Sequence, residues 1–281
     1  MRTRLRGAID SATTLLADAG IDSARYEAEE LAAHLTGTER GRLPLIESPD
    51  DAFFERYHAA IAARSRRVPL QHITGTAAFG PLTLFVGPGV FIPRPETEAM
   101  LEWATAQRLP DAPVIIDLCT GSGALAIALA QHRPQARVLG IDDSDAALDY
   151  ARRNAVGTNV ELMHADVTDP SLLTDLDRQV DLVVANPPYV PDGSLVGPEV
   201  SQYDPPHAVF GGTDGMAVID AIVPLAGRWL RPGGLFAVEH DDTTSSLTSE
   251  LISSTGFFDD VVAHKDLTGR PRFVTARRSD S

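Results

Sequence analysis

Hydrophobic and polar residues follow one pattern at the start of the chain and another in its larger part. Up to residue 70 apolar residues recur at helical spacing, as at Ile9, Leu15 and Leu16, and Ala, Leu and Arg dominate. Glycines at positions 20, 37 and 41 interrupt this pattern. We therefore expect residues 1–70 to form a bundle of four or five short helices.

Glycine and proline become frequent between residues 71 and 95. They surround short β-type runs, of which 82–86 (Leu-Thr-Leu-Phe-Val) is the clearest. Such runs separated by turn residues are typical of a β-hairpin. We expect this stretch to be a hairpin linker between two domains.

From residue 96 to 281 β-type runs alternate with helical segments. Helical segments separate the first five runs, which predicts a mostly parallel sheet with helices on both faces. The expected strands are 114–118, 137–141, 160–163, 181–185, 235–239, 261–264 and 272–276.

Composition narrows the class of protein. The 281 residues are 43% hydrophobic, and no run approaches the roughly 18 apolar residues of a membrane helix. The basic N-terminus is not followed by an apolar stretch, so no signal peptide is expected. A single cysteine, Cys119, excludes an internal disulfide, and the histidines show no metal-ligand spacing. We expect a cytoplasmic protein without a metal site.

The formal net charge is −15, and almost all of the excess lies after residue 70. A protein that grips nucleic acid through its phosphates normally carries a basic face. The charge therefore argues against direct binding of nucleic acid and is compatible with a basic protein partner. No membrane partner is expected.

The first candidate site is the segment 117–123 (Asp-Leu-Cys-Thr-Gly-Ser-Gly), which joins an expected strand to an expected helix. Glycines in such a turn let the backbone approach a ligand at the open end of the sheet. The next strand ends at Asp142, 21 residues after Gly121. An acid there can accept hydrogen bonds from both hydroxyls of a ribose. At this point NAD and S-adenosylmethionine fit equally well.

The second candidate site is the tetrad Asn186-Pro187-Pro188-Tyr189, directly after strand 181–185. In a parallel sheet it lies at the carboxyl edge, beside the Gly-rich turn. Two prolines remove two amide donors, so the Asn186 side-chain oxygen and a Pro187 carbonyl remain as acceptors. Two converging acceptors can fix a planar NH2 group while Tyr189 packs against its flat face. The tetrad predicts in-line methyl transfer to such a nitrogen, without a strong base.

The tetrad resembles that of methyltransferases acting on exocyclic or amide nitrogens, among them DNA adenine methyltransferases. Other segments resemble one family, the release-factor glutamine methyltransferases (HemK/PrmC), and the likeness covers roughly residues 1–276. These segments are 69–75 (Pro-Leu-Gln-His-Ile-Thr-Gly), 91–98 (Phe-Ile-Pro-Arg-Pro-Glu-Thr-Glu), 208–215 (Ala-Val-Phe-Gly-Gly-Thr-Asp-Gly) and 266–272 (Asp-Leu-Thr-Gly-Arg-Pro-Arg).

The resemblance implies a seven-stranded, Rossmann-like class I methyltransferase domain after an N-terminal helical bundle that docks the substrate. It implies S-adenosyl-L-methionine as cofactor and S-adenosyl-L-homocysteine as product. The methyl group is expected on the side-chain amide nitrogen (N5) of the glutamine in the Gly-Gly-Gln motif of peptide chain release factors.

The same resemblance assigns roles to residues. The expected catalytic residues are Asn186, Pro187 and Tyr189. Pro188 and Phe91 are expected to line the substrate pocket with them. The cofactor-binding residues that it implies are Cys119, Thr120, Gly121, Ser122, Gly123, Asp142, Val167 and Asn186.

Three positions depart from the family pattern, and the first is His72, where the family usually has Tyr. Cys119 stands where the family commonly has Gly, and Val167 stands where an aromatic residue often flanks the adenine. Two alternatives stay open. One is a methyltransferase of the same nitrogen chemistry acting on DNA adenine or another protein. The other is an NAD-dependent or non-catalytic nucleotide-binding protein.

Overall fold

The structure is a computed structural model that describes residues 2–47, 49–266 and 268–280. Its internal contacts divide the chain into two compact units. One contains residues up to 76 together with 197–203, and the other contains residues 77–196 together with 204–281. Leu267, within the family-like segment 266–272, lies outside the described residues.

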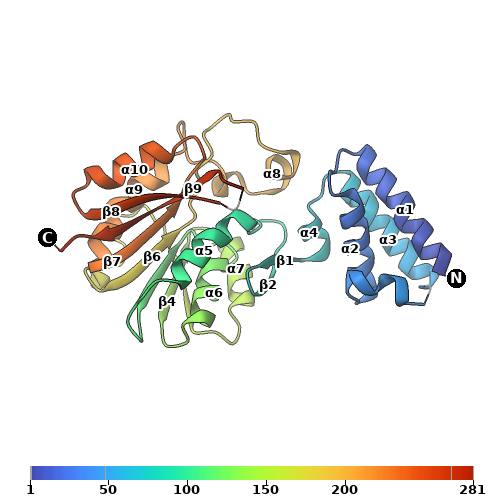
Figure 1. Ribbon diagram of the computed structural model, residues 1–281, viewed down its shortest axis with the longest axis horizontal. Coiled ribbons are helices and arrows are strands. Elements are labelled where there is room, and N and C mark those ends of the chain that lie inside the picture. The colour runs from blue at the N-terminus through green and yellow to red at the C-terminus, as the bar shows by residue number, and fades with distance from the viewer. Residues whose placement is uncertain (1, 48, 267, 281) are drawn as a thin grey trace. The chain divides into compact units, whose positions relative to one another are not determined.

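The first unit is helical, as its sequence predicts (Figure 1). Apolar side chains at helical spacing bury its core, in which Leu16, Leu31 and Tyr57 are fully inaccessible. Asp50 caps a helix by accepting a 2.8 Å hydrogen bond from the Phe53 amide. Its elements are α1 (Arg2–Asp18), α2 (Ala24–Thr36), η1 (Arg40–Leu45), α3 (Asp51–Ser65), α4 (Leu70–Thr74) and α8 (Pro198–Tyr203).

The short helix α8 comes from far along the chain, yet buried charges tie it to the helical unit. Arg64 of α3 is 6% exposed and pairs with Glu27 of α2. The same guanidinium lies 3.0 Å from Glu199 of α8, and Arg67 lies 2.9 Å from the other Glu199 oxygen. Two arginines thus share one carboxylate. They hold Glu199, which comes ten residues after Tyr189 of the Asn-Pro-Pro-Tyr tetrad, within the helical unit.

A two-stranded hairpin, β1 (Thr76–Phe79) and β2 (Leu82–Phe85), follows the helical segment as expected. Gly80 adopts a positive φ of 51° in the turn, a conformation that costs glycine little. The side chains of Phe79 and Leu84 are buried against the second unit's core. The hairpin is therefore part of the packed structure of that unit.

A seven-stranded sheet forms the centre of the second unit, with the strand order β5-β4-β3-β6-β7-β9-β8 (Figure 1). The first five strands in this order are parallel, and β9 runs antiparallel to both β7 and β8. This confirms the seven expected strands, with ends extended by up to five residues. The strands are β3 (Val114–Leu118), β4 (Arg137–Asp142), β5 (Val160–His164), β6 (Val180–Ala185), β7 (Leu230–Glu239), β8 (Phe258–Lys265) and β9 (Pro271–Arg278).

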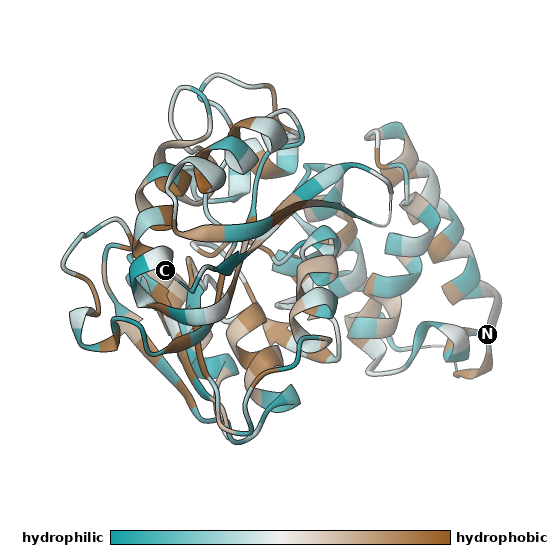
Figure 2. Cartoon of the chain, turned by 60° about the vertical axis from the view of Figure 1, so that its left-hand side comes forward, coloured by the Kyte–Doolittle hydropathy of each residue, from teal (hydrophilic) through white to brown (hydrophobic). Residues whose placement is uncertain are grey.

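Alternate residues of the strands enter two separate hydrophobic cores. Ile115 and Leu182 face α5 and α6, whereas Ile116 and Val183 face α9 and α10. Figure 2 shows hydrophobic residues both in the strands and in the helices of this unit. None of the described helices is long and apolar enough to span a membrane. The helices of this unit are α5 (Glu98–Thr105), α6 (Ala124–His132), α7 (Asp145–Asn154), α9 (Ala217–Trp229) and α10 (Ser245–Ser254), with 3-10 turns η2 (Pro95–Thr97), η3 (Thr174–Leu176) and η4 (Pro206–Ala208).

One expectation about the connections is wrong. The segment between β5 and β6 contains only the 3-10 turn η3 and no α-helix. The carboxylates of Asp166 and Asp169 accept hydrogen bonds from the amides of Thr168 and Ser171, two residues further on. Such local bonds compete with helical ones and favour turns. Leu172 and Leu176 of this loop still complete the core.

Candidate active site

The carboxyl ends of the parallel strands bring the expected site residues to one edge of the sheet. β3 lies between β4 and β6, and β7 follows β6. The Gly-rich turn follows β3, Asp142 ends β4, Asn186 follows β6 and Glu239 ends β7. Because parallel strands end at the same edge, these groups are neighbours although the chain separates them widely.

The Gly-rich turn has left-handed backbone at three alternate positions. Cys119, Gly121 and Gly123 have φ values of 57°, 57° and 86°. The φ of 86° favours glycine at position 123, and an added Cβ there would come within 2.8 Å of Ile127 Cδ1, which would have to move. At Gly121, apart from its two neighbours in the chain, no atom of the described residues lies within 4 Å of such a position. The turn is therefore closely packed towards the helix and open at Gly121, where a ligand can approach the backbone.

Asp117, at the end of β3, is a site residue that reasoning from the sequence did not single out. Its Oδ2 accepts hydrogen bonds from the Thr120 hydroxyl at 2.6 Å and the Ala126 amide at 3.0 Å. Its Oδ1, like the hydroxyl of Ser122, is buried without a partner among the described residues. Burial raises the pKa of Asp117 to about 7, against the lowering effect of those two hydrogen bonds. Its position as the first residue of the Gly-rich segment could have identified it from the sequence.

Asp142 is held in place by the backbone on both sides of its carboxylate. Oδ2 accepts a hydrogen bond from the Gly121 amide at 2.8 Å, and Oδ1 accepts one from the Ser144 amide at 3.0 Å. Burial raises the pKa of Asp142, and the two amide bonds oppose this shift. Each oxygen keeps a second lone pair, which matches two ribose hydroxyls.

These residues fit a nucleoside ligand that carries a positive charge near the turn. Asp117 offers a buried carboxylate oxygen that lacks a partner, Gly121 offers an open backbone and Asp142 offers two acceptors. Val167 follows β5 and is buried in the core on the side of α9 and α10, and its place beside an adenine stays a prediction. No group of three or more His, Cys, Asp or Glu side chains in the described parts of the chain could hold a metal ion.

Cys119 is not arranged as a nucleophile. Burial and the nearby carboxylates of Asp142 and Asp117 raise the pKa of its thiol well above the ordinary value. The thiol is therefore protonated at neutral pH. Its φ of 57° explains why glycine suits this position, since a Cβ is strained in left-handed backbone.

In the Asn-Pro-Pro-Tyr tetrad the Asn186 side chain is half-buried, and the Tyr189 hydroxyl is hydrogen-bonded. The Asn186 amide nitrogen donates a 3.1 Å hydrogen bond to the hydroxyl of Thr97. Its oxygen has no donor among the described residues and remains available as an acceptor. The Tyr189 hydroxyl donates a 3.4 Å hydrogen bond to Glu239, and the positive charge of Arg272 acts on the phenol to lower its pKa. Burial raises the pKa of Tyr189, so the phenol stays protonated.

The family-like segment 208–215 supports the back of the tetrad. The amide of Val190 donates to Val209 at 3.0 Å, and the amide of Gly211 donates to Val190 at 2.9 Å. A Cβ at Gly211 would come within 2.4 Å of the Pro188 oxygen, and one at Gly215 within 2.2 Å of the Tyr189 oxygen. The glycines of this segment therefore allow a backbone contact that shapes the loop from behind.

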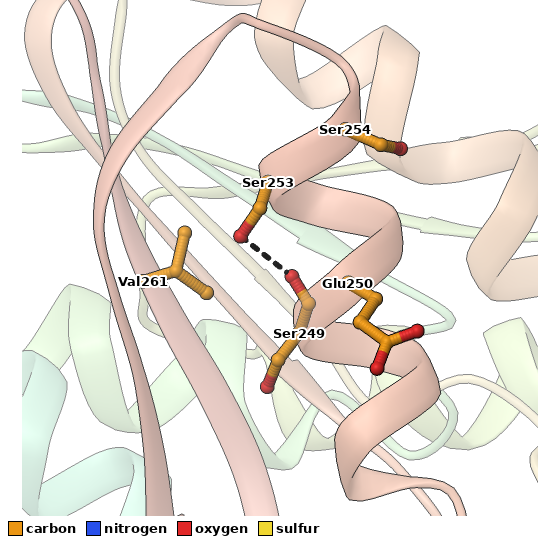
Figure 3. A pocket seen from close by; sticks show the side chains of 5 residues that line it. All are labelled: Ser249, Glu250, Ser253, Ser254 and Val261. Atoms are coloured by element: carbon orange, nitrogen blue, oxygen red, sulfur yellow. Dashed lines mark hydrogen bonds between the residues drawn. The ribbon is translucent and has the colours of Figure 1, made fainter.

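Two further observations place the remaining candidates. Phe91 is half-buried, with the Arg94 guanidinium 4.8 Å from its ring centroid, and Arg94 pairs with buried Asp204. The structure shows no direct bond from Phe91 to the tetrad, so its place in the pocket stays a prediction. A separate shallow hollow between α10 and β8 contains none of these residues (Figure 3). It is lined by Ser249, Glu250, Ser253, Ser254 and Val261.

Sequence reasoning also missed Thr97, Glu239 and Arg272, which surround the tetrad. Thr97 and Arg272 lie in the family-like segments 91–98 and 266–272, which were recognised as wholes. Glu239 is 1% exposed at the end of β7, and burial raises its pKa to about 7 despite Thr97 and Arg272. The sequence feature that could have identified Glu239 is an acidic residue at the end of an apolar strand, because parallel strands end at the edge of the sheet where ligands bind.

The fold and this edge of the sheet define the chain as an S-adenosylmethionine-dependent methyltransferase of class I. A 16S rRNA methyltransferase of Thermus thermophilus, solved with AdoMet and guanosine, shares the fold with a TM-score of 0.51. It is 23% identical, and the match covers 72% of this chain and 49% of that one. Residues 7–75 match the PrmC N-terminal domain family, and residues 95–200 match the methyltransferase small domain family.

The chain belongs to the family of release factor glutamine methyltransferases. The member from Mycobacterium tuberculosis is 69% identical over 278 residues, which are 98% of this chain and 91% of that protein. The member from Mycobacterium leprae is 69% identical over 285 residues, covering 100% of this chain and 99% of that protein. The similarity thus extends through both units.

Proposed function

We propose that this protein transfers a methyl group from S-adenosylmethionine to the side-chain amide nitrogen of a release-factor glutamine. The observation that carries the proposal is the Asn186 side chain, whose nitrogen is anchored on Thr97 and whose oxygen is left as an acceptor. An acceptor at this place fits an NH2 donor beside a methyl-donor site. The identity of 69% to family members over nearly the whole chain favours the release factor over DNA or another protein.

The proposed cofactor site uses residues that end or follow the strands β3, β4 and β5. Asp117 and the turn at Thr120 and Gly121 would hold the methionine end, Asp142 the ribose, and Val167 the adenine. The cofactor supplies an electrophilic methyl group on a sulfonium. Asp117, with its buried and unpartnered oxygen, is the group suited to the ammonium of the methionine part.

The proposed chemistry of the protein is positioning. The Asn186 oxygen and the Pro187 carbonyl accept the two amide hydrogens and point the nitrogen at the methyl carbon, while Pro188, Tyr189 and Phe91 surround the amide. The two acceptors would stabilise the positive charge that develops on the amide nitrogen when it takes the methyl group and S-adenosyl-L-homocysteine leaves. The amide then loses one proton to water. Burial keeps Tyr189 protonated, which suits a packing role.

We further propose that the helical unit helps dock the folded release factor and that the reaction takes place in the cytoplasm, where translation ends. The N-terminal domain match over residues 7–75 supports a family-specific role for this unit. A Gly-Gly-Gln tip suits a narrow pocket because glycine lets the backbone approach closely. The net charge of −15 supports a protein rather than a nucleic-acid substrate.

The test is mass spectrometry of a folded release factor incubated with the enzyme and S-adenosylmethionine. One added methyl on the Gly-Gly-Gln glutamine is expected, with duplex DNA in parallel remaining unmodified. A short peptide with the same motif should have a much lower kcat/KM, because it must be ordered on binding. Methylation of DNA, or of another residue of the factor, would contradict the proposal.

A further inference from the structure

The segment that follows the tetrad crosses from the second unit into the helical unit and back. The chain passes between the two units at residues 76–77, 196–197 and 203–204. The first passage leads from the helical segment into the hairpin. The other two enclose α8, so residues 190–204 form a strap that has both ends in the second unit and its middle in the helical unit.

Both ends of the strap are held inside the second unit. At its start Val190 forms a parallel bridge with Phe210, and the Val190 oxygen accepts a 2.9 Å hydrogen bond from the Gly211 amide. At its end the buried carboxylate of Asp204 pairs with the guanidinium of Arg94. The tetrad, which directly precedes Val190, therefore has support from its own unit and does not depend on α8 for it.

The middle of the strap is held in the helical unit by one face of α8. Glu199 and Tyr203 lie one helical turn apart and so share that face. One Glu199 oxygen accepts a 3.0 Å hydrogen bond from Arg64, and the other accepts a 2.9 Å hydrogen bond from Arg67. The Tyr203 hydroxyl donates to the backbone oxygen of Arg66 at 3.4 Å. Two side chains of α8 thus contact the C-terminal end of α3.

Charge balance strengthens this attachment. The guanidinium of Arg64 is buried and pairs with Glu27, while Glu199 supplies the carboxylate that balances Arg67. Burial disfavours the charge of Glu199, but the hydrogen bonds from Arg67 and Arg64 lower its pKa, so the carboxylate is ionised at neutral pH. Hydrogen bonds between charged and partly buried groups are stronger than exposed ion pairs. Loss of Glu199 would leave a buried arginine with one acceptor fewer.

We propose that Glu199 and Tyr203 are positioning residues that attach the strap to the helical unit, so that a release factor docked there presents its glutamine to the tetrad. The inference rests on the proposed function, in which the helical unit receives the folded factor. Two units joined at one place turn readily relative to one another, and a second attachment removes much of that freedom. A glutamine tip kept near the tetrad has a high effective concentration there, whereas a free peptide does not use the attachment.

The test removes the attachment and leaves the tetrad unchanged. Glu199→Gln keeps the size of the side chain without its charge, Tyr203→Phe removes the hydroxyl, and the two are combined in one variant. For a folded release factor kcat/KM should fall about tenfold or more, and for a short Gly-Gly-Gln peptide it should stay within about twofold of the parent value. Glu161→Gln is the control, since Glu161 near the start of β5 also binds arginine through both oxygens, with Arg137 at 3.0 Å and 2.9 Å. It should change neither value.

A distance measurement tests the attachment without any methyl transfer. Spin labels are placed on Glu55→Cys of α3 and Glu250→Cys of α10, two exposed positions, in a full-length Cys119→Ala background. Pulsed electron paramagnetic resonance should give a narrow distance distribution with the native strap. The distribution should broaden clearly when Glu199→Gln and Tyr203→Phe are added, because the helical unit then turns more freely.

The outcomes distinguish this inference from the proposed function. An equal loss of kcat/KM for the folded factor and the peptide would show that α8 supports the tetrad itself, and this would overturn the inference. An unchanged preference for the folded factor, or an unchanged distance distribution, would overturn it as well. Failure of the parent enzyme to methylate a folded release factor would overturn the proposed function, and the distance distributions would still decide whether Glu199 and Tyr203 attach the strap.

Discussion

The cofactor turn and the amide site lie at the same edge of the sheet but are built from contacts of very different range. In the turn Asp117 bonds to residues 3 and 9 positions away, and Asp142 bonds to Gly121, 21 positions away. In the amide site Asn186 bonds to Thr97 across 89 positions, and Tyr189 to Glu239 across 50. The turn is held by its own strand and helix and by the adjacent strand β4, whereas the amide site joins the segment after β6 to β7 and to η2, far away in the chain.

This difference teaches how damage to each region should spread. A change in the turn acts on backbone that its immediate neighbours hold, so of the two functions it should affect cofactor binding and not the rate of methyl transfer. A change in the amide site acts on side chains brought from separate segments, so it should affect catalysis without affecting the cofactor. The following predictions test that division.

The largest expected effect is that of Asn186→Ala. It removes the proposed acceptor, so the rate of methyl transfer should fall about a hundredfold or more, with the affinity for S-adenosylmethionine unchanged. Single-turnover kinetics and calorimetry measure the two quantities. Asn159→Ala, which removes an exposed side chain that donates to Ala136 at 2.7 Å, is the control. A matching loss of cofactor affinity would show that the two regions are not separable.

Gly215→Ala should disturb the amide site from behind. Its Cβ would come within 2.2 Å of the Tyr189 oxygen, and its φ is 77°. Gly157 has a similar φ of 83° but nothing within 4 Å of a Cβ, so Gly157→Ala carries the backbone strain alone. We expect Gly215→Ala to lose about 2–3 kcal/mol of unfolding free energy, clearly more than Gly157→Ala. Urea unfolding measures both, and equal losses would contradict the steric argument.

Asp142→Ala should act on the cofactor alone. Loss of two charge-assisted hydrogen bonds should weaken S-adenosylmethionine binding by about 1–3 kcal/mol. At saturating cofactor the rate of methyl transfer should recover. Asp143→Ala removes the exposed neighbouring carboxylate and should change neither quantity. Unchanged affinity in Asp142→Ala would refute the ribose assignment.

Asp117 makes the turn sensitive to pH. Its pKa of about 7 in the folded chain exceeds its ordinary 3.8, so its contribution to stability is complete below about pH 4 and is lost as the pH rises through 7. The Asp117→Asn side chain stays neutral at every pH. Without cofactor, the variant's unfolding free energy should therefore exceed the parent's by roughly 1–2 kcal/mol at pH 8, and this difference should disappear towards pH 4. The pKa of Glu239 is raised in the same direction, but Glu239 is present in both proteins, so its effect cancels in the comparison. Urea unfolding at both pH values tests this, and a constant difference would contradict it.

The smallest effect is expected at Cys119. Because its φ of 57° strains a Cβ, Cys119→Gly should raise the unfolding free energy by up to about 1 kcal/mol. Cys119→Ala removes the thiol but keeps the Cβ, and it should show no such gain. Thermal unfolding of both variants separates the backbone from the sulfur. Equal stabilities would mean that the strain is not significant.

Sequence patterns predicted much of the second unit because its strands are strongly apolar and its turns are marked. The expected strand 114–118 agrees with β3 at both ends, since Pro113 precedes it and the Gly-rich turn follows it. The helix expected between β5 and β6 was wrong because Asp166 and Asp169 bond to nearby amides, a competition that hydrophobic spacing does not reveal. The site residues expected in the turn and the tetrad lie at the carboxyl edge, and their roles stay predictions.

The sequence by itself determined the two patterns of secondary structure, the Gly-rich turn, the acid after the second strand and the tetrad. These features depend on residues close together in the chain, because composition and spacing determine the short-range preferences of the backbone. Only the tertiary structure decided that Thr97 meets Asn186, that Glu239 meets Tyr189 and that α8 joins the helical unit. Those contacts depend on strand order and register, which arise when distant segments pack together and which no local pattern encodes.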